Sequence, residues 1–94
     1  MGKSGMTLQP LTPDLAAQLG VAANTQGLVV TNVDPNGTAA DAGLQQGDVI
    51  LEVNRQPVKT SSDFAAAVDR SAQRPALILV NRRGATIYLT LQSR

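Results

Sequence analysis

The sequence predicts a single α+β domain, a partial β-barrel of about five strands with two main helices. Apolar residues make up 43% of the 94-residue chain, which is enough for one modest core. Short runs rich in Val, Ile, Leu and Thr are separated by turns that contain Gly, Pro or Asn. The helical segments do not alternate regularly with these runs, which argues against a doubly wound parallel sheet. We expect one domain over residues 1–94, in which residues 1–2 can be a cloning remnant.

The N-terminal segment predicts a strand followed by a helix. In residues 5–11, alternate apolar residues share one face of the strand: Met6, Leu8 and Pro10. The helix over residues 12–20 has Thr12 as its N-cap, because a Thr hydroxyl accepts a hydrogen bond from the first turn, and Gly20 ends it. Two of its residues lie four apart and should face the core: Leu15 and Leu19.

The next segment predicts a strand, a tight turn and a short helix. Residues 27–33 are rich in β-formers, and the turn Asp34–Gly37 contains Pro and Asn-Gly, which suit its central positions. Thr38 is the expected N-cap of a helix over residues 39–42, whose alanines allow close packing on a sheet. We expect this helix to end at Gly43.

A buried strand and the longest helix follow. Residues 48–53 predict the strand, and residues 54–57 predict a turn. Thr60 and Asp63 have the spacing of a capping box, for a helix that ends near Ser71. The apolar stripe of that helix consists of Phe64, Ala67 and Val68.

Two strands joined by a hairpin complete the chain, over residues 76–81 and 86–91. In the second strand, apolar residues alternate with Thr and Tyr, which predicts one buried face and one wetter face. Arg82 and Arg83 lie between the strands, and we expect both side chains to be solvated at the hairpin tip. The inward set of the second strand is Ile87, Leu89 and Leu91.

Composition argues against several function classes. The chain has 8 Lys and Arg residues and 7 Asp and Glu residues, so its net charge is +1. It lacks the cluster of basic residues that nucleic-acid binding normally requires. The chain has no His, the base of a Ser-His-Asp triad, and no Cys, so common zinc sites lose their usual ligands. We therefore expect no catalytic residue, no metal and no cofactor. No apolar run approaches the roughly 20 residues of a membrane span, and we expect neither membrane insertion nor a signal peptide.

The most informative segment runs from Asp34 to Asn54. It has the order tight turn, short helix with a Gly stop, second Gly turn and strand, in which Gly43, Gly47 and Asp48 are expected to be structural. This pattern resembles the central segment of PDZ domains, and most of all the version found in the bacterial HtrA/Deg serine proteases. The resemblance extends over nearly all of the chain.

Two further segments resemble the same protease family. Residues 11–21 are similar to the segment between the Gly loop and the next strand in Deg proteases, and residues 86–92 to the end of their second, C-terminal PDZ domain. Many animal PDZ domains have a strand before the Gly loop. Here the strand over residues 86–91 matches it, so the resemblance implies the circularly permuted bacterial order.

In PDZ domains a peptide C-terminus extends the sheet beside a helix, and backbone N–H groups of a Gly-containing loop hold its carboxylate. The family's loop has the pattern x-apolar-Gly-apolar. Gly5 and Met6 match it, whereas Ser4 departs from it, which makes the pocket shallower or more polar. Lys3 is either solvated or helps to hold the carboxylate. The resemblance implies these peptide-binding residues: Lys3, Ser4, Gly5, Met6, Thr7 and Leu8 from the loop and strand, and Ser61, Ala65 and Val68 from the helix.

Some of these residues also fit a purely structural role. Met6, Leu8 and Val68 would be apolar in any fold with this core, and Ser61 is equally suited to beginning a helix. Gly5 can be a residue of a flexible leader. The sequence alone leaves these alternatives open.

The resemblance implies a peptide-binding module of a periplasmic HtrA/Deg-type serine protease. Such a module binds hydrophobic C-termini or exposed segments of misfolded proteins, contacts other domains or subunits of the parent protease, and regulates its assembly. By itself it is not an enzyme, because the catalytic triad lies in a separate domain. The alternatives are a PDZ domain of a carboxyl-terminal processing protease, an intramembrane metalloprotease or a type II secretion component, or a domain that only makes contacts between subunits.

Overall fold

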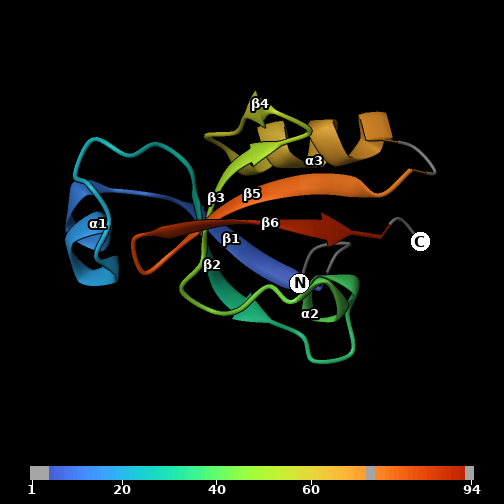
Figure 1. Cartoon of the computed structure of the whole chain (residues 1–94), viewed down its shortest axis with the longest axis horizontal. Helices are drawn as coiled ribbons and strands as arrows, with labels where there is room; N and C mark the ends of the chain where they lie inside the picture. Colours follow the sequence, from blue (N-terminus) through green and yellow to red (C-terminus); the bar gives the residue numbers. More distant parts are fainter. Residues whose placement is uncertain (1–4, 72–73, 93–94) are drawn as a thin grey trace.

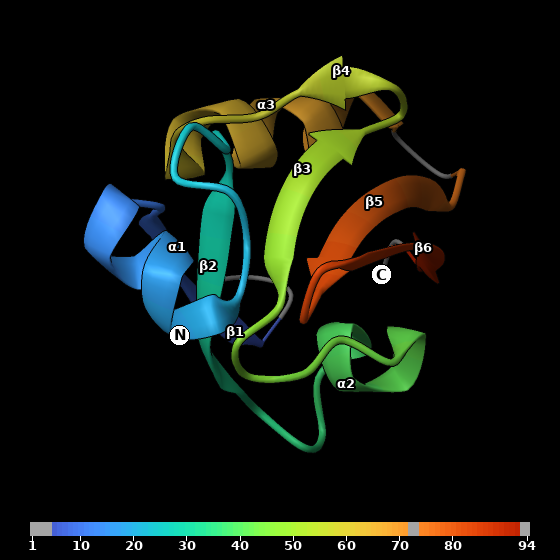
Figure 2. The ribbon, with the colours of Figure 1, turned by 60° about the vertical axis from the view of Figure 1, so that its left-hand side comes forward.

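The computed structural model describes residues 5–71 and 74–92. The strands of these residues form one antiparallel, six-stranded sheet in the order β1-β2-β3-β5-β6, with β4 paired to β3. The sheet is open and curved (Figures 1 and 2), which confirms the predicted α+β fold. The strands are β1 (Met6–Pro10), β2 (Leu28–Val33), β3 (Val49–Val53), β4 (Gln56–Pro57), β5 (Ala76–Arg82) and β6 (Ala85–Leu91).

The described residues also form three helices: α1 (Pro13–Leu19), α2 (Thr38–Ala42) and α3 (Ser61–Ser71). α3 contacts β1 and β3, whereas α2 contacts β6. Figures 1 and 2 show α3 and α2 on opposite sides of the curved sheet. In residues 5–71 and 74–92, no helix has the length and apolar character needed to cross a membrane.

The caps of α1 are as predicted, but its packing is not. Thr12 Oγ1 accepts a hydrogen bond from the Leu15 N–H at 3.2 Å, and Gly20 ends the helix with φ of 74°. The buried residue of α1 is Ala16, whereas Leu15 and Leu19 are half-buried and lie outside the central core cluster. The prediction that the two leucines face the core was wrong, because this short helix packs closely through its small alanine.

α2 begins one residue earlier than predicted, and Thr38 is not its cap. Gly37 is the N-cap residue, and no side chain caps the first turn. Thr38 is instead the first residue of the helix. A hydroxyl caps the first turn only from the extended N-cap position, which Gly37 occupies here. Gly43 ends the helix with φ of 94°, as predicted.

The capping box of α3 is formed as predicted. Thr60 Oγ1 accepts a hydrogen bond from the Asp63 N–H at 3.0 Å, and the Asp63 carboxylate accepts bonds from the N–H groups of Lys59, at 3.0 Å, and Thr60, at 3.3 Å. The bond from Lys59, followed by those from Thr60, lowers the pKa of the Asp63 carboxyl below its ordinary value. Phe64 and Ala67 are buried, so the apolar stripe faces the core.

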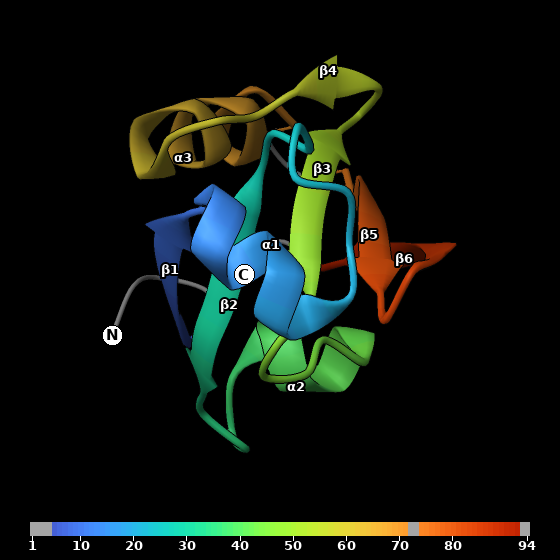
Figure 3. The same ribbon diagram turned by 90° about the vertical axis from the view of Figure 1, so that its left-hand side faces the viewer.

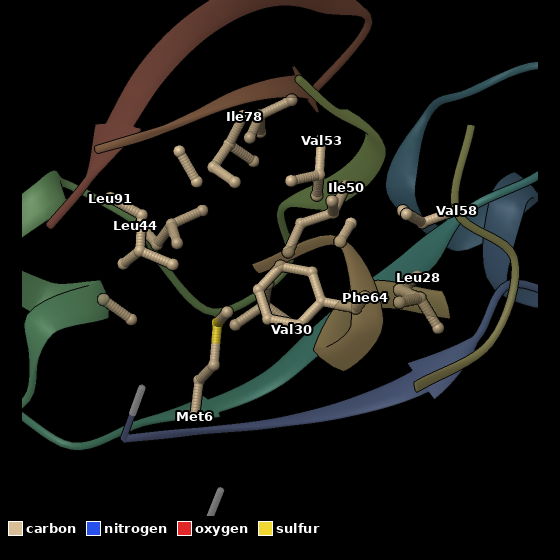
Figure 4. Packing of buried hydrophobic residues seen from close by; sticks show 14 residues of the cluster. Met6, Leu28, Val30, Leu44, Ile50, Val53, Val58, Phe64, Ile78 and Leu91 are labelled. Atoms are coloured by element: carbon tan, nitrogen blue, oxygen red, sulfur yellow. The ribbon is translucent and has the colours of Figure 1, made fainter. Parts of the chain in front are cut away.

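The core joins residues of the sheet to α2 and α3 (Figure 4). β6 alternates as predicted, with Leu91 buried, Ile87 and Leu89 packed against the core, and Tyr88 57% exposed. The central cluster consists of Met6, Leu28, Val30, Ala39, Leu44, Ile50, Val53, Val58, Phe64, Ala67, Ala76, Ile78, Val80 and Leu91.

The predicted turn over residues 54–57 is tighter than expected. Asn54 and Arg55 have φ of 51° and 68°, and the next two residues form β4. The Asn54 amide also anchors the end of α3, because its Nδ2 donates to the Ser71 hydroxyl while its Oδ1 accepts from the Leu77 N–H at 2.9 Å. This turn therefore links β3, α3 and β5.

Arg82 is not a solvated residue of the hairpin tip. Its guanidinium donates to both carboxylate oxygens of Asp48, at 2.8 Å each, and to the Gly43 carbonyl at 2.8 Å. Asp48 is 2% exposed and also accepts a bond from the Gln45 N–H at 2.9 Å. The hydrogen bonds to Asp48 raise the pKa of Arg82 above its ordinary value. The expectation was wrong for Arg82, because its partner lies 34 residues away, and right for Arg83, which is exposed.

Candidate functional site

The outer edge of β1 is a free sheet edge. β1 pairs with β2 on one side, and no strand within residues 5–71 and 74–92 pairs with it on the other. α3 contacts β1 and lies beside it (Figure 3). The strand and the helix that carry the predicted binding residues are therefore neighbours in space.

The hydrogen bonds of β1 show which of its backbone groups point toward the free edge. The carbonyl of Gly5 accepts a bond from the Asp34 N–H at 2.6 Å, and that of Thr7 accepts one from a Thr hydroxyl of β2 at 3.1 Å. Both carbonyls thus point toward β2. Successive residues of a strand turn their N–H and C=O groups to opposite edges. The polar backbone groups at the free edge are therefore those of Met6 and Leu8.

Gly5 leads into β1 in a conformation that favours glycine. It is buried and has φ of +76°. A Cβ at this position would lie 3.0 Å from the Gly37 Cα and 3.2 Å from the Asp34 Cβ, so a larger residue would push against this turn. The turn Asp34–Gly37 therefore supports the start of β1 and holds Gly5 in place.

The side chains of β1 divide between the core and the solvent. Met6 is 4% exposed and belongs to the core cluster, so its backbone is the part available to a ligand. Leu8 is half-buried and packs against the core, which leaves part of its side chain accessible. Thr7 is exposed, as expected for a residue on the opposite face of the strand.

The predicted residues of α3 lie on one flank of the helix. At 3.6 residues per turn, Ser61, Ala65 and Val68 follow one another along the helix surface. Ser61 and Ala65 are exposed, whereas Val68 is half-buried against the core. One turn beyond Ala67 on the buried stripe, the Ser71 hydroxyl bonds to Asn54 in the β3–β4 turn. The flank with Ala65 therefore lies beside the buried stripe and is open to solvent.

Two of the predicted residues, Lys3 and Ser4, lie outside the described residues. In contrast, three residues that the sequence did not assign to the site support it. Asp34 and Gly37 contact Gly5, and Asn54 anchors the C-terminal end of α3. The Asp-Pro-Asn-Gly turn could be recognised from the sequence, but its contact with Gly5 joins segments far apart in the chain. No local pattern indicates that contact.

The free edge of β1 offers backbone N–H and C=O groups to a ligand. Within residues 5–71 and 74–92, no group of three or more His, Cys, Asp or Glu side chains could hold a metal ion. An unpaired strand edge can bind an extended chain through its N–H and C=O groups. The geometry is therefore suited to binding a peptide as an added strand.

Comparisons with known proteins identify the family and the fold of the chain. The family model described as "PDZ domain" matches residues 29–82. Over 88 residues, the chain is 33% identical to a "Probable periplasmic serine endoprotease DegP-like" of Chlamydia pneumoniae. This match includes 94% of the chain but 18% of the relative, so the chain spans less than a fifth of that protein's length.

Two solved structures share the fold. The crystal structure of the HtrA3 PDZ domain bound to a phage-derived ligand, FGRWV, has a TM-score of 0.78 and 28% identity, over 94% of this chain and 80% of that one. The HtrA-type protease AlgW with a decapeptide has a TM-score of 0.79 and 36% identity, over 95% of this chain and 27% of that one.

Proposed function

Because the chain belongs to the PDZ domain family, we propose that it binds C-terminal ends of peptides and proteins whose last residue is apolar. The free edge of β1, between the buried Gly5 and the flank of α3, is the observation that carries this proposal. Backbone N–H groups beside Gly5 hold the carboxylate, and the apolar side chain lies against Leu8 and Val68. The proposed binding residues are Lys3, Ser4, Gly5, Met6, Thr7, Leu8, Ser61, Ala65 and Val68.

We further propose that the domain is a non-catalytic module of a periplasmic HtrA/Deg-type serine protease. The similarity to a DegP-like periplasmic serine endoprotease and to an HtrA-type protease supports this proposal. The sequence also contains no His, and a Ser-His-Asp triad requires one. The module would tether exposed C-termini of misfolded proteins and contact other domains or subunits. The coding sequence of the parent gene tests the assignment. A Gly-Asn-Ser-Gly-Gly-type motif upstream is expected, whereas a His-Glu-x-x-His motif would indicate a metalloprotease instead.

Binding of the peptide FGRWV should depend on its free carboxylate. The acid form is expected to bind with a Kd near 1 μM, which corresponds to about 8 kcal/mol. The C-terminal amide should bind roughly ten- to hundredfold more weakly, because a hydrogen bond to a charged group contributes about 1.5–3 kcal/mol. Isothermal titration calorimetry with both forms measures the difference. Equal affinity for acid and amide would show that the loop at Gly5 holds no carboxylate.

A bulky side chain on the flank of α3 should block the site without unfolding the domain. Ala65→Arg is expected to lower the affinity for FGRWV at least tenfold, because the added side chain would lie where the peptide binds beside β1. Ala65 is exposed, so its charged replacement can reach water and should change the stability by less than about 0.5 kcal/mol. Peptide titration and a melting curve on the same preparation separate the two effects.

The control for this experiment is Ala66→Arg. Ala66 is also exposed, but it lies one residue further around α3, on the surface that faces away from the core. This variant should bind FGRWV as the wild-type protein does. If Ala65→Arg binds normally, or if both variants lose binding equally, the flank of Ala65 is not the peptide site. A large loss of stability in Ala65→Arg would instead place Ala65 in the core.

A further inference from the structure

Pro10 is the last residue of β1 and is exposed. Gly5 and Thr7 face β2 through their carbonyls, and the Leu11 N–H donates to the Gly27 carbonyl at 3.0 Å. The odd-numbered residues of this segment thus face β2, so the nitrogen of Pro10 faces the free edge together with the N–H groups of Met6 and Leu8. Proline has no N–H to offer there. The row of donors along the free edge therefore ends at Leu8.

The position of the carboxylate determines how a bound peptide meets this row. With its C-terminus at Gly5, the peptide runs antiparallel to β1. In an antiparallel ladder, every second residue forms a hydrogen-bonded pair. The last peptide residue then lies opposite Met6, the third from the end opposite Leu8, and the fifth from the end opposite Pro10. The carbonyl of that fifth residue meets the proline ring instead of a donor.

We propose that Pro10 limits recognition to the last four residues of the ligand. This inference rests on the proposed function. Residues beyond the fourth gain no complete backbone pair with β1, since Pro10 can offer its carbonyl but no N–H. Pro10 is therefore the residue that sets how many ligand residues can pair with the free edge of β1.

The test compares peptide length in two proteins. The probes are the last four residues of FGRWV with a free N-terminus, so that the shorter peptide lacks the carbonyl of a fifth residue, and the same peptide extended at its N-terminus by two residues, Ser-Thr. The wild-type protein should bind both with affinities within about twofold. The variant Pro10→Ala restores an N–H at the free edge, and it should bind the longer peptide about two- to tenfold more tightly than the shorter one. In this variant, the amide resonance of residue 10 should shift only with the longer peptide.

Pro57→Ala is the matched control, because Pro57 is also an exposed strand proline but lies in β4, which pairs with β3. It should show the same length dependence as the wild-type protein. Pro10→Val is a second variant, with a residue that favours strands, in case Pro10→Ala frays at the end of β1. The inference is overturned if the wild-type protein gains affinity with length as the variants do, or if neither variant gains any. Equal binding of the acid and amide forms of the shorter peptide would contradict the proposed function itself.

Discussion

The free energy of unfolding should fall by about 3–5 kcal/mol in Phe64→Ala. Phe64 is the one Phe of the chain, and it is 7% exposed. Its ring lies in the central cluster, beneath α3 (Figure 4). Removing it leaves a cavity that the surrounding β-branched and Leu side chains fill only in part, because their backbones are held in the sheet. Urea denaturation followed by circular dichroism measures the loss.

A domain of this size has a total stability of about 5–15 kcal/mol, so this variant should be close to unfolding at physiological temperature. The control is Phe64→Leu, which keeps most of the volume and should lower the stability by less than about 1.5 kcal/mol. An unfolding midpoint of Phe64→Ala equal to that of the wild-type protein would show that the ring contributes little to the core.

Asp48→Ala should lower the free energy of unfolding by about 3 kcal/mol. The substitution removes two hydrogen bonds from Arg82 and one from the Gln45 N–H. The Arg82 side chain is 29% exposed and can turn toward water, so the loss should lie at the low end of the range for a broken buried ion pair. Thermal melting at constant pH should show a midpoint lower by about 12 °C or more.

A double-mutant cycle isolates the ion pair from the other contacts of Asp48. If the guanidinium and the carboxylate act together, Asp48→Ala combined with Arg82→Ala should be less destabilising than the sum of the two single changes. Arg83→Ala serves as a neutral comparison, because Arg83 is exposed at the hairpin. Strict additivity of the two changes would mean that the pair contributes nothing beyond its separate contacts.

Features that depend on neighbouring residues could be predicted from the sequence. The N-cap of α1 and the capping box of α3 require residues only three positions apart, and both are present with hydrogen bonds of 3.0–3.3 Å. The helix ends at Gly20 and Gly43 follow from the left-handed conformation that glycine adopts freely. The alternation in β6 follows from the two-residue period of a strand.

Features that depend on contacts between distant segments could not be predicted in this way. Arg82 is followed by Arg83 and a Gly, which locally indicates a solvated tip, and only the fold brings it to Asp48. Likewise, the packing of Gly5 against Gly37 requires the sheet to be assembled first. At the site, the sequence identified the strand and the helix, but it could not separate the buried Met6 from the half-buried Leu8. Their exposure depends on how the residues of the core cluster, which come from several elements, pack around β1.

The short free edge of β1 also bears on solubility. An open sheet with an unpaired edge can join the same edge of a second copy, and this pairing is a common first step of aggregation. Here such a contact would be restricted to the backbone groups of Met6 and Leu8, because Pro10 interrupts any longer ladder. Two copies therefore cannot build a long, continuous ladder through this edge, which is the pairing that fibrils need. A single proline at the end of β1 keeps this edge available to a small ligand and unsuitable for long pairing with the same edge of a second copy.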